Sequence, residues 1–465
     1  MYLAFDPKYS LRKGERNILF YRANYETGNL EDLRLLHPNT AIVLSLFNGR
    51  RGIEEIKSII SQLFEISPEE KREYFKNFLE TWSPFLCEVT DANKHLIKQY
   101  DQKEFIIDAS QVDLTHFRLT APITLAYLPT YSCSRNCIYC YAEKEFSPFQ
   151  AEMPFEKIKA IINEMRKLRV IMLSLGGGDA FTREDFLDIL QVVISANITP
   201  IVSTKEYLSE PTVRRLREIG LKTIQLSVDS PVPEIADFLT GSKEYFSQII
   251  KTMDRLLKNN IKVTTNTVVT SYNFHELPKL ILFLIEKGIA SIHLSQYARS
   301  LYRHRDDLFL YRKDTNWLAS EVNHIQNKYP HCNIEFAGVS RELEDPEEEL
   351  RKHLTRPPCP AGKSSFVILP DGKVILCEQL PSVSEFVVGD LNRQSIQEVW
   401  DSSALKKLIY PSKELFEDAG CSSCDEFEHC VLRLGRCIRE TFKAYGNIYS
   451  VDPNCPKASA PLRLS

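Results

Sequence analysis

The chain has 465 residues and a formal net charge of −4; 43% of its residues are hydrophobic and 26% are charged. This composition is that of a globular protein, the length predicts more than one domain, and the slightly acidic balance argues against binding to nucleic acid or to an anionic membrane. No stretch is apolar for long enough to span a membrane, and the first residues lack the pattern of a signal peptide. We therefore expect a cytoplasmic protein with no nucleic-acid partner and no membrane partner.

The cysteines are the most informative part of the composition. There are 12 of them, and ten lie either between residues 133 and 140 or beyond residue 358. Because disulfides are disfavoured in a reducing cytosol, clustered cysteines predict metal binding or catalysis. Cys87 and Cys332 stand apart, and a buried structural thiol is the better interpretation for each.

Residues 1–100 are predicted to form a module of their own. A short β-rich run at residues 17–22 precedes a helical pattern that starts after His37 and ends near Asn48-Gly49. A further amphipathic helix is predicted from Ile53 onward, because its isoleucines recur at helical spacing.

Strands followed by three short helices resemble the winged-helix precursor-recognition domain of peptide-modifying enzymes. In that family a leader peptide adds as an extra strand to an exposed sheet edge. The alternative is a DNA-binding winged helix. Its recognition helix would be basic, whereas residues 52–66 carry Glu54 and Glu55 against a single lysine, Lys57. The resemblance therefore implies a precursor peptide, bound through its leader, as a partner.

Residues 101–310 are predicted to contain alternating strands and helices, the pattern of βαβ units around a parallel sheet. We expect six strands, at residues 123–127, 171–175, 199–203, 223–228, 262–269 and 291–295. Six such units form a partial barrel rather than a closed eight-stranded one. Active-site loops gather at the C-terminal ends of such strands.

The loop after the first predicted strand contains Cys133, Cys137 and Cys140 in the spacing CxxxCxxC. Three thiolates this close can hold three irons of a [4Fe–4S] cluster and leave the fourth iron without a protein ligand. A zinc site or three unrelated buried thiols are the alternatives, although zinc prefers four ligands. With Tyr139 before the third cysteine, the loop resembles the signature of the radical S-adenosylmethionine (SAM) enzymes. The resemblance implies that these cysteines are catalytic, through a cluster that binds SAM and cleaves it to a 5′-deoxyadenosyl radical.

Further SAM contacts are expected at the following strand ends. Gly177 and Gly178 lack Cβ atoms and leave room for a ligand, and the Asp179 carboxylate can accept hydrogen bonds from an ammonium group. They resemble the family's Gly-Gly-Glu element, with Asp in place of Glu, although a tight turn would have the same sequence. The full set that the resemblance implies for cofactor binding is Tyr139, Gly177, Gly178, Asp179, Ser203, Ser227 and Asp229.

One family feature is missing from the chain. Members often pair the SAM carboxylate with an arginine that lies shortly before a glycine, but residues 238–241 read Phe-Leu-Thr-Gly. Lys205 and Arg299 are the candidate replacements.

Residues 311–355 are predicted to bridge to a second cysteine-rich module, residues 356–465. Its spacings are C-x12-G-x4-C and CxxCx5C, and the module resembles the SPASM module of peptide-modifying radical SAM enzymes, which carries two auxiliary iron–sulfur clusters. Zinc sites are the alternative. The resemblance implies a distal cluster on Cys421, Cys424, Cys430 and Cys455, and a proximal cluster on Cys359, Cys377 and Cys437. The proximal cluster would then have an open iron that can hold a substrate thiolate, unless Cys332 is its fourth ligand.

The order of these modules resembles that of radical SAM maturases. It implies an α/β fold with a partial (β/α)6 radical SAM barrel, an N-terminal winged-helix-like domain and a C-terminal Fe–S SPASM module. The expected cofactors are SAM and three [4Fe–4S] clusters, and the expected electron donor is a flavodoxin or ferredoxin. The leading product is a cysteine thioether in a ribosomally made peptide. A carbon–carbon crosslink or formylglycine is the enzymatic alternative, and an electron-transfer or zinc-bound peptide-binding protein is the alternative outside enzymes.

Overall fold

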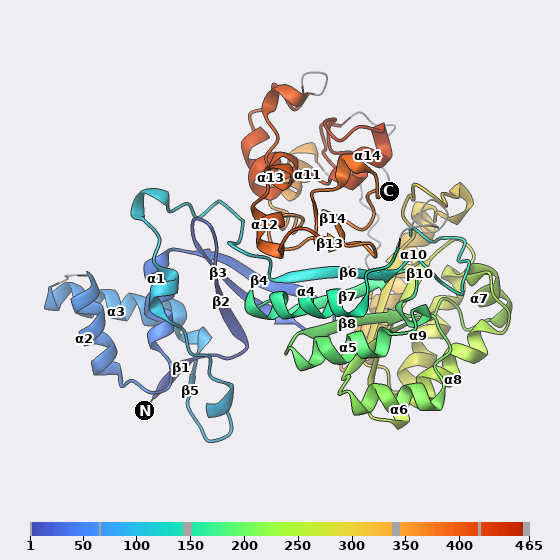
Figure 1. Cartoon of the computed structure of the whole chain (residues 1–465), viewed down its shortest axis with the longest axis horizontal. Helices are drawn as coiled ribbons and strands as arrows, with labels where there is room; N and C mark the ends of the chain where they lie inside the picture. The colour runs from blue at the N-terminus through green and yellow to red at the C-terminus, as the bar shows by residue number, and fades with distance from the viewer. Residues whose placement is uncertain (1, 65–66, 143–150, 337–344, 417–419, 459–465) are drawn as a thin grey trace. The chain divides into compact units, whose positions relative to one another are not determined.

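The computed structural model describes residues 2–64, 67–142, 151–336, 345–416 and 420–458 (Figure 1). The chain divides into two compact units, Met1–Thr120 and Ala121–Ser465.

The N-terminal unit combines two small antiparallel sheets with three helices. One sheet has the order β2-β3-β4, and the other pairs β1 with β5. The bounds are β1 Leu3–Phe5, β2 Tyr9–Lys13, β3 Ile18–Asn24, β4 Asn29–Leu36, α1 Pro38–Leu46, α2 Ile53–Phe64, α3 Pro68–Trp82 and β5 Leu86–Glu88. The helices at 38–46 and 53–64 lie where the apolar spacing predicted them.

An aromatic core holds this unit together. Phe20 on the central strand is fully buried, and its ring lies 5.9 Å from that of Trp82 on α3. The rings of Phe47 and Phe78 stack at the same separation of 5.9 Å. Burial of each large aromatic side chain contributes about 1.5–3 kcal/mol, so these rings fix the helices against the sheet.

The segment after residue 100 also belongs to this unit. Arg118, whose side chain is fully buried, forms an ion pair with Glu15, and the Nε2 atom of His116 lies 3.0 Å from the same carboxylate. Leu119 forms a β-bridge with Gly14. The first unit therefore extends to residue 120.

The second unit is built on a ten-stranded sheet in the order β12-β11-β10-β9-β8-β7-β6-β13-β14-β15. Strands β6 to β12 are all parallel to their neighbours. Their crossover helices pack on the sheet (Figure 1). The bounds are β6 Thr124–Thr130, α4 Phe155–Lys167, β7 Met172–Gly177, α5 Phe186–Ser195, β8 Thr199–Thr204, α6 Glu210–Glu218, β9 Thr223–Ser227, α7 Pro233–Thr240, α8 Tyr245–Lys258, β10 Lys262–Val269, α9 Leu277–Glu286 and β11 Ser291–Gln296. The prediction of an α/β fold with six strands of a partial barrel is confirmed.

A seventh parallel strand lies in the region that was predicted only to bridge two modules. Helix α10 (Arg312–Lys328) leads to β12 (Asn333–Phe336), which pairs with β11. The strand has four residues, and Ile334 is its one buried member, so its apolar pattern is too short to be recognised in the sequence. Residues 337–344 of the bridging region lie outside the described residues, and α11 (Pro346–Leu354) follows them.

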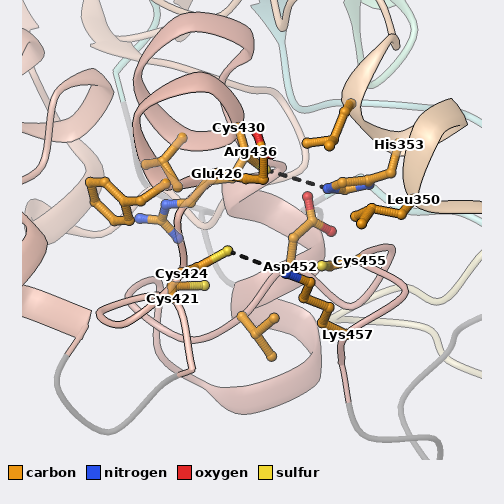
Figure 2. Close-up of a pocket in the computed structure, with 14 residues that line it drawn as sticks. Leu350, His353, Cys421, Cys424, Glu426, Cys430, Arg436, Asp452, Cys455 and Lys457 are labelled. Carbon is orange, nitrogen blue, oxygen red and sulfur yellow. Dashed lines mark hydrogen bonds between the residues drawn. The ribbon is translucent and has the colours of Figure 1, made fainter. Parts of the chain in front are cut away.

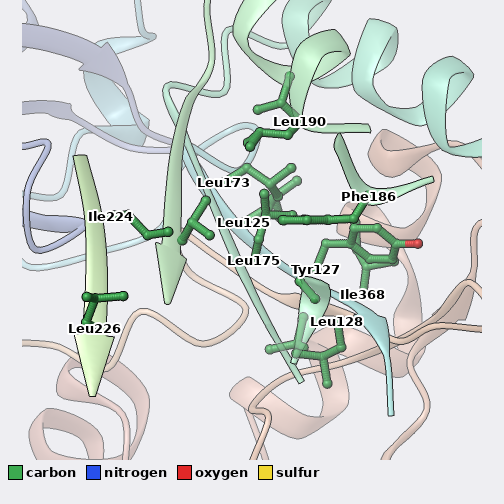
Figure 3. Close-up of a cluster of buried hydrophobic side chains, with 14 of the residues drawn as sticks. Leu125, Tyr127, Leu128, Leu173, Leu175, Phe186, Leu190, Ile224, Leu226 and Ile368 are labelled. Atoms are coloured by element: carbon green, nitrogen blue, oxygen red, sulfur yellow. The ribbon is translucent and has the colours of Figure 1, made fainter. Parts of the chain in front are cut away.

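The C-terminal module continues the barrel's own sheet. Strand β13 (Val367–Ile368) lies parallel to β6, with Ile368 opposite Tyr127, and it turns through residues 370–372 into β14 (Lys373–Ile375). Strand β15 (Gly389–Asp390) pairs with β14. Figure 3 shows Ile368 in one apolar cluster with β6 and β7 side chains. The module and the barrel therefore share a core.

The rest of the C-terminal module is helical. Its elements are α12 Ile396–Asp401, α13 Ser403–Ile409, a π-helix Glu428–Leu434 and α14 Ile438–Tyr445. None of the helices that the structure describes is both long and apolar enough to cross a membrane.

Candidate active site

The three cysteines of the CxxxCxxC motif share one loop, which follows β6. The backbone N–H groups of Asn136 and Ile138 donate to the last carbonyl groups of α7, at 3.1 and 3.0 Å, so the helix end holds the loop in place. Cys137 is buried, and burial raises the pKa of its thiol to about 11, with smaller contributions from nearby Cys140 and Cys133. The other two thiols of the motif are therefore close to Cys137.

Gly177 and Gly178 bring the end of β7 against this loop. The N–H of Gly178 donates to the Thr130 carbonyl at 2.9 Å, and that of Asp179 donates to the Ser132 carbonyl at 2.8 Å. A Cβ on Gly178 would lie 1.9 Å from the Ser132 oxygen, and Gly177 has a φ of +102°. The space left by the missing Cβ atoms is thus filled by the backbone of the cysteine loop, a contact that the sequence did not indicate.

Gly178→Ala is expected to displace the start of the cysteine loop and to lower the iron bound by Cys133, Cys137 and Cys140. The added Cβ meets a backbone oxygen rather than a flexible side chain, and such overpacking costs about 1–3 kcal/mol. Iron per chain and the cluster's electron paramagnetic resonance (EPR) signal after reconstitution measure the effect. Gly52→Ala is the matched control, since its Cβ meets nothing within 4 Å. Full iron content in Gly178→Ala would contradict this expectation.

Asp179 connects the ends of β7 and β8. Its carboxylate accepts hydrogen bonds from the Thr204 hydroxyl at 2.8 and 2.9 Å and from the backbone N–H of Lys205 at 2.9 Å. Burial raises the pKa of Asp179 to about 6, against the opposing effect of these bonds. Thr204 is buried here, whereas its neighbour Ser203 is half-buried and does not take part in these bonds. Successive strand residues face opposite sides, and the sequence pattern did not identify which side faces the site.

Tyr139 and Asp229 form a buried pair. The Tyr139 hydroxyl donates to the Asp229 carboxylate, which also accepts from the backbone N–H of Val268 at 3.1 Å. Burial raises the pKa of Tyr139 well above its ordinary value, and the adjacent carboxylate adds to this. The Ser227 carbonyl accepts from the Tyr245 hydroxyl at 2.5 Å. The predicted residues of the fourth strand thus lie next to the cysteine loop.

Two cations are available in this part of the molecule. The Lys205 ammonium group lies 5.5 Å from the centre of the Tyr139 ring. Burial lowers the pKa of Lys205, but Asp229 and the thiols of Cys137 and Cys140 outweigh it, so the pKa is raised and the group stays charged. The Nε atom of Arg299 is buried and has no hydrogen-bond partner among the described residues. Both candidates for the SAM carboxylate are thus charged groups after the parallel strands.

A polar pair lies where the C-terminal module meets the barrel. The Tyr141 hydroxyl donates to the Glu378 carboxylate at 2.9 Å, and Glu378 follows Cys377 directly. Burial raises the pKa of Glu378, while Tyr141 and then Arg439 lower it. A cavity at this position is also lined by Gly177. The sequence analysis missed Glu378, since 237 residues separate it from Tyr141.

The four cysteines of the expected distal site line one pocket, which Figure 2 shows. Cys430 accepts hydrogen bonds from Arg356 at 3.5 Å and lies 3.4 Å from the His353 ring, while Lys457 donates to Cys424 at 3.8 Å. Burial raises the pKa of Cys421 to about 11, and the other three thiols contribute. The set that the structure brings together is Cys421, Cys424, Cys430 and Cys455.

In the expected proximal site, Cys359 lies beside the segment that leads to Cys437, because its backbone N–H donates to the Leu434 carbonyl at 2.7 Å. Burial raises the pKa of Cys377, with a contribution from Cys359. Burial lowers the pKa of Arg439, but the nearby thiols of Cys437 and Cys377 outweigh it, so the pKa is raised. Cys332 lies elsewhere: it precedes β12, an edge strand of the sheet, and the strands β11 to β6 lie between β12 and β13. It is a buried thiol, as expected, whereas Cys87 on β5 is only half-buried.

These donor sets fit clusters. A [4Fe–4S] cluster binds each thiolate through a different iron, so its cysteine sulfurs stand further apart than those around one ion. Three thiols on one loop and four around one pocket supply the thiolate ligands that such clusters take, and the buried Arg299 Nε atom suits an anionic group such as a carboxylate.

Comparison with known proteins agrees with this arrangement. Residues 127–284 match the Radical SAM superfamily model, and residues 359–425 match the SPASM model of an iron–sulfur cluster-binding domain. The AdoMet-dependent heme synthase of Methanosarcina barkeri is 23% identical over 348 residues, covering 72% of this chain and 96% of the relative. The PqqA peptide cyclase of Gluconobacter oxydans is 23% identical over 340 residues, covering 72% and 90%.

Solved structures match nearly the whole chain. Streptococcus suis SuiB bound to S-adenosylmethionine has a TM-score of 0.69 at 18% identity and covers 97% of this chain and 99% of its own. SuiB bound to the precursor peptide SuiA has a TM-score of 0.67, with the same identity and coverage. These matches show the fold.

The chain is thus an enzyme that depends on SAM, with a radical SAM domain followed by an iron–sulfur SPASM domain. Its cofactors are SAM and [4Fe–4S] clusters. When bound, they supply a carbon-centred radical that abstracts hydrogen from a substrate, while the protein orients the reactants and excludes water.

Proposed function

We propose that the chain is a maturase that crosslinks a ribosomally made precursor peptide, with a cysteine thioether as the leading product. The observation that carries the proposal is the position of Glu378, next to Cys377 and bonded to Tyr141 beside the Gly177 strand end. The names of two similar proteins add support, since one is a PqqA peptide cyclase and another was crystallised with a precursor peptide.

Thioether formation removes two hydrogens from the peptide. One leaves a carbon as a hydrogen atom, which the 5′-deoxyadenosyl radical takes up. The other leaves the cysteine thiol as a proton, and the one electron released when the carbon–sulfur bond forms would pass to the proximal cluster. The Glu378 carboxylate lies where the radical SAM domain meets the proximal cysteines, so it would accept the thiol proton. Proton transfer by a positioned carboxylate contributes about 10²–10⁴-fold to such reactions. Tyr141 would hold the carboxylate in place through its hydroxyl.

The cysteine ligand sets are part of the proposal. Cys133, Cys137 and Cys140 would hold the SAM-binding cluster, and the sets given above would hold the distal and proximal clusters. The proximal cluster would keep an iron open for a substrate thiolate, and the distance of Cys332 from this module along the sheet supports that assignment. Lys205, charged and next to Tyr139, would pair with the SAM carboxylate, with Arg299 as the alternative.

The N-terminal unit would bind the leader of the peptide along β4. The other edge strand, β2, is covered, because Lys98 donates to the carbonyl groups of Pro7 and Tyr9, each at 2.8 Å, and Tyr100 accepts from Leu11 at 3.1 Å. Among the described residues, β4 has a strand on one side only. Its outer backbone groups are therefore available to an added strand.

Proline substitutions on β4 test this role. Successive N–H groups of a strand point to opposite edges, so Arg34→Pro and Leu35→Pro remove one N–H bonded to β3 and one on the free edge. The variant that loses the bond to β3 is expected to have a lower melting temperature, whereas the variant that loses the N–H on the free edge should melt like the wild type. We expect this second variant to bind the leader peptide about tenfold more weakly, which is the effect of one lost backbone hydrogen bond. Fluorescence titration with labelled leader measures it, and unchanged affinity in that variant would speak against β4.

The proposed activity is tested by co-expression with a short cysteine-containing reading frame adjacent in the genome, followed by mass spectrometry. A loss of two hydrogens per crosslink is expected, together with loss of reactivity toward a thiol-alkylating reagent. A peptide with Ser in place of Cys is the control. The same mass loss with the thiol still reactive would favour a carbon–carbon crosslink, and an unchanged mass would count against both.

A further inference from the structure

Arg436 is a buried cation in the distal cysteine pocket. The residue is 5% exposed, and its two terminal nitrogens have no hydrogen-bond partner in the part of the chain that the structure describes. It lines the pocket with Cys421, Cys424, Cys430 and Cys455 (Figure 2). An unpaired buried guanidinium group is costly, so its donors need an acceptor.

The surroundings of Arg436 hold its guanidinium group without giving it an anion. The rings of Phe416 and Tyr449 lie 4.8 and 5.6 Å from its central carbon, and such contacts orient a cation. Asp452 and Glu426 are the acidic side chains of the pocket. The Asp452 oxygens accept from the backbone N–H of Cys437 at 3.0 Å and that of Asn454 at 2.9 Å, and neither carboxylate is a hydrogen-bond partner of the Arg436 terminal nitrogens.

The other side-chain nitrogen groups at this pocket differ from Arg436. His353, Arg356 and Lys457 each reach a cysteine sulfur at 3.4, 3.5 and 3.8 Å. The terminal nitrogens of Arg436 have no such partner among the described residues. Its acceptor is therefore the group that the four cysteines hold, and four thiolates make that group anionic, more so after it gains an electron.

We propose that Arg436 donates hydrogen bonds to the distal cluster and raises its reduction potential. This inference rests on the distal ligand set of the proposed function. A fixed cation stabilises the more negative, reduced form, and hydrogen bonding to cluster sulfurs is one of the means by which proteins set such potentials. Arg436 is then a positioning and tuning residue rather than a ligand.

The test is an EPR-monitored redox titration of Arg436→Met. Cys133, Cys137 and Cys140 are replaced by alanine in every protein, which leaves only the auxiliary clusters to observe. We expect the equilibrium constant for distal reduction to fall at least tenfold, which corresponds to about 59 mV for one electron. The proximal signal is expected to be unchanged. Arg436→Lys keeps the charge, and its distal potential is expected to lie between those of the wild type and Arg436→Met. If Arg436→Met fails to retain iron, a distal potential of Arg436→Lys below that of the wild type is the expected result.

Arg433→Met is the matched control, because Arg433 lies in the same segment but is half-exposed and pairs with Glu428 at 3.2 Å. It is expected to leave both potentials unchanged. Equal distal potentials in wild type, Arg436→Met and Arg436→Lys would overturn the inference, as would an equal shift in Arg433→Met. Cys424→Ala tests the distal ligand set separately from the role of Arg436. If Cys424→Ala leaves the iron content and both auxiliary signals intact, the ligand set of the proposed function is wrong.

Discussion

Cys137→Ala is expected to abolish the conversion of SAM to 5′-deoxyadenosine while the iron bound by the C-terminal cysteines stays in place. Cys137 is the buried member of its triplet, and its loop is fixed by the end of α7. Losing one of three thiolates leaves two protein ligands for a cluster that needs three. Liquid chromatography of anaerobic reactions with dithionite measures 5′-deoxyadenosine, and iron assay measures the clusters that remain.

Cys332→Ala provides the control for this experiment. Its thiol is as deeply buried as that of Cys137, but it lies next to β12, and its neighbours are the Ile289 carbonyl and apolar side chains. The substitution is expected to lower stability slightly and to leave 5′-deoxyadenosine formation unchanged. Residual SAM cleavage by Cys137→Ala above the rate without protein would contradict the assignment of the triplet.

Glu378→Gln is expected to separate SAM cleavage from crosslinking. The amide keeps the size of the carboxylate but cannot accept the thiol proton, so the radical would form without efficient capture of sulfur. We expect crosslinked peptide to fall about 10²–10⁴-fold, the usual contribution of a positioned proton acceptor. 5′-Deoxyadenosine should persist at a level near that of the wild type. The measurement is the ratio of crosslink to 5′-deoxyadenosine in the same reaction.

Two further variants sharpen this result. Tyr141→Phe removes the hydroxyl that holds Glu378 at 2.9 Å, and a smaller loss of crosslink is expected. Glu385→Gln changes an exposed carboxylate of the same module and should have no effect. If Glu378→Gln lowered crosslink and 5′-deoxyadenosine equally, Glu378 would support the SAM site instead of accepting the substrate proton.

Much of the barrel could be predicted because each of its strands and helices has a recognisable pattern within its own short segment of sequence. Each of the six strands is a short apolar run ahead of a helical pattern, and their predicted bounds lie within a few residues of those in the structure. The cysteine motif is local too, since its three thiols share eight residues. Strand β12 was not predicted because four residues with one buried side chain carry too little periodicity.

Contacts between residues that are far apart in the chain could not be predicted from the sequence. Gly178 suggested room for a ligand, but its neighbour is the Ser132 carbonyl, a contact that depends on how two loops meet. Glu378 and Arg436 carried no motif, and both gained significance only from burial and from what lies beside them. Spacing identifies ligands on one segment, whereas a proton acceptor or tuning cation is defined by tertiary packing.

The pairing of β13 with β6 also bears on how the chain acquires its structure during synthesis. Strand β6 is the first strand of the barrel to leave the ribosome, yet its outer partner is made only when residues 367 and 368 emerge. Until then β6 is an open sheet edge that can associate with other chains, and its loop carries three free thiols. A chain truncated before residue 367 is therefore expected to aggregate rather than to yield a smaller working barrel.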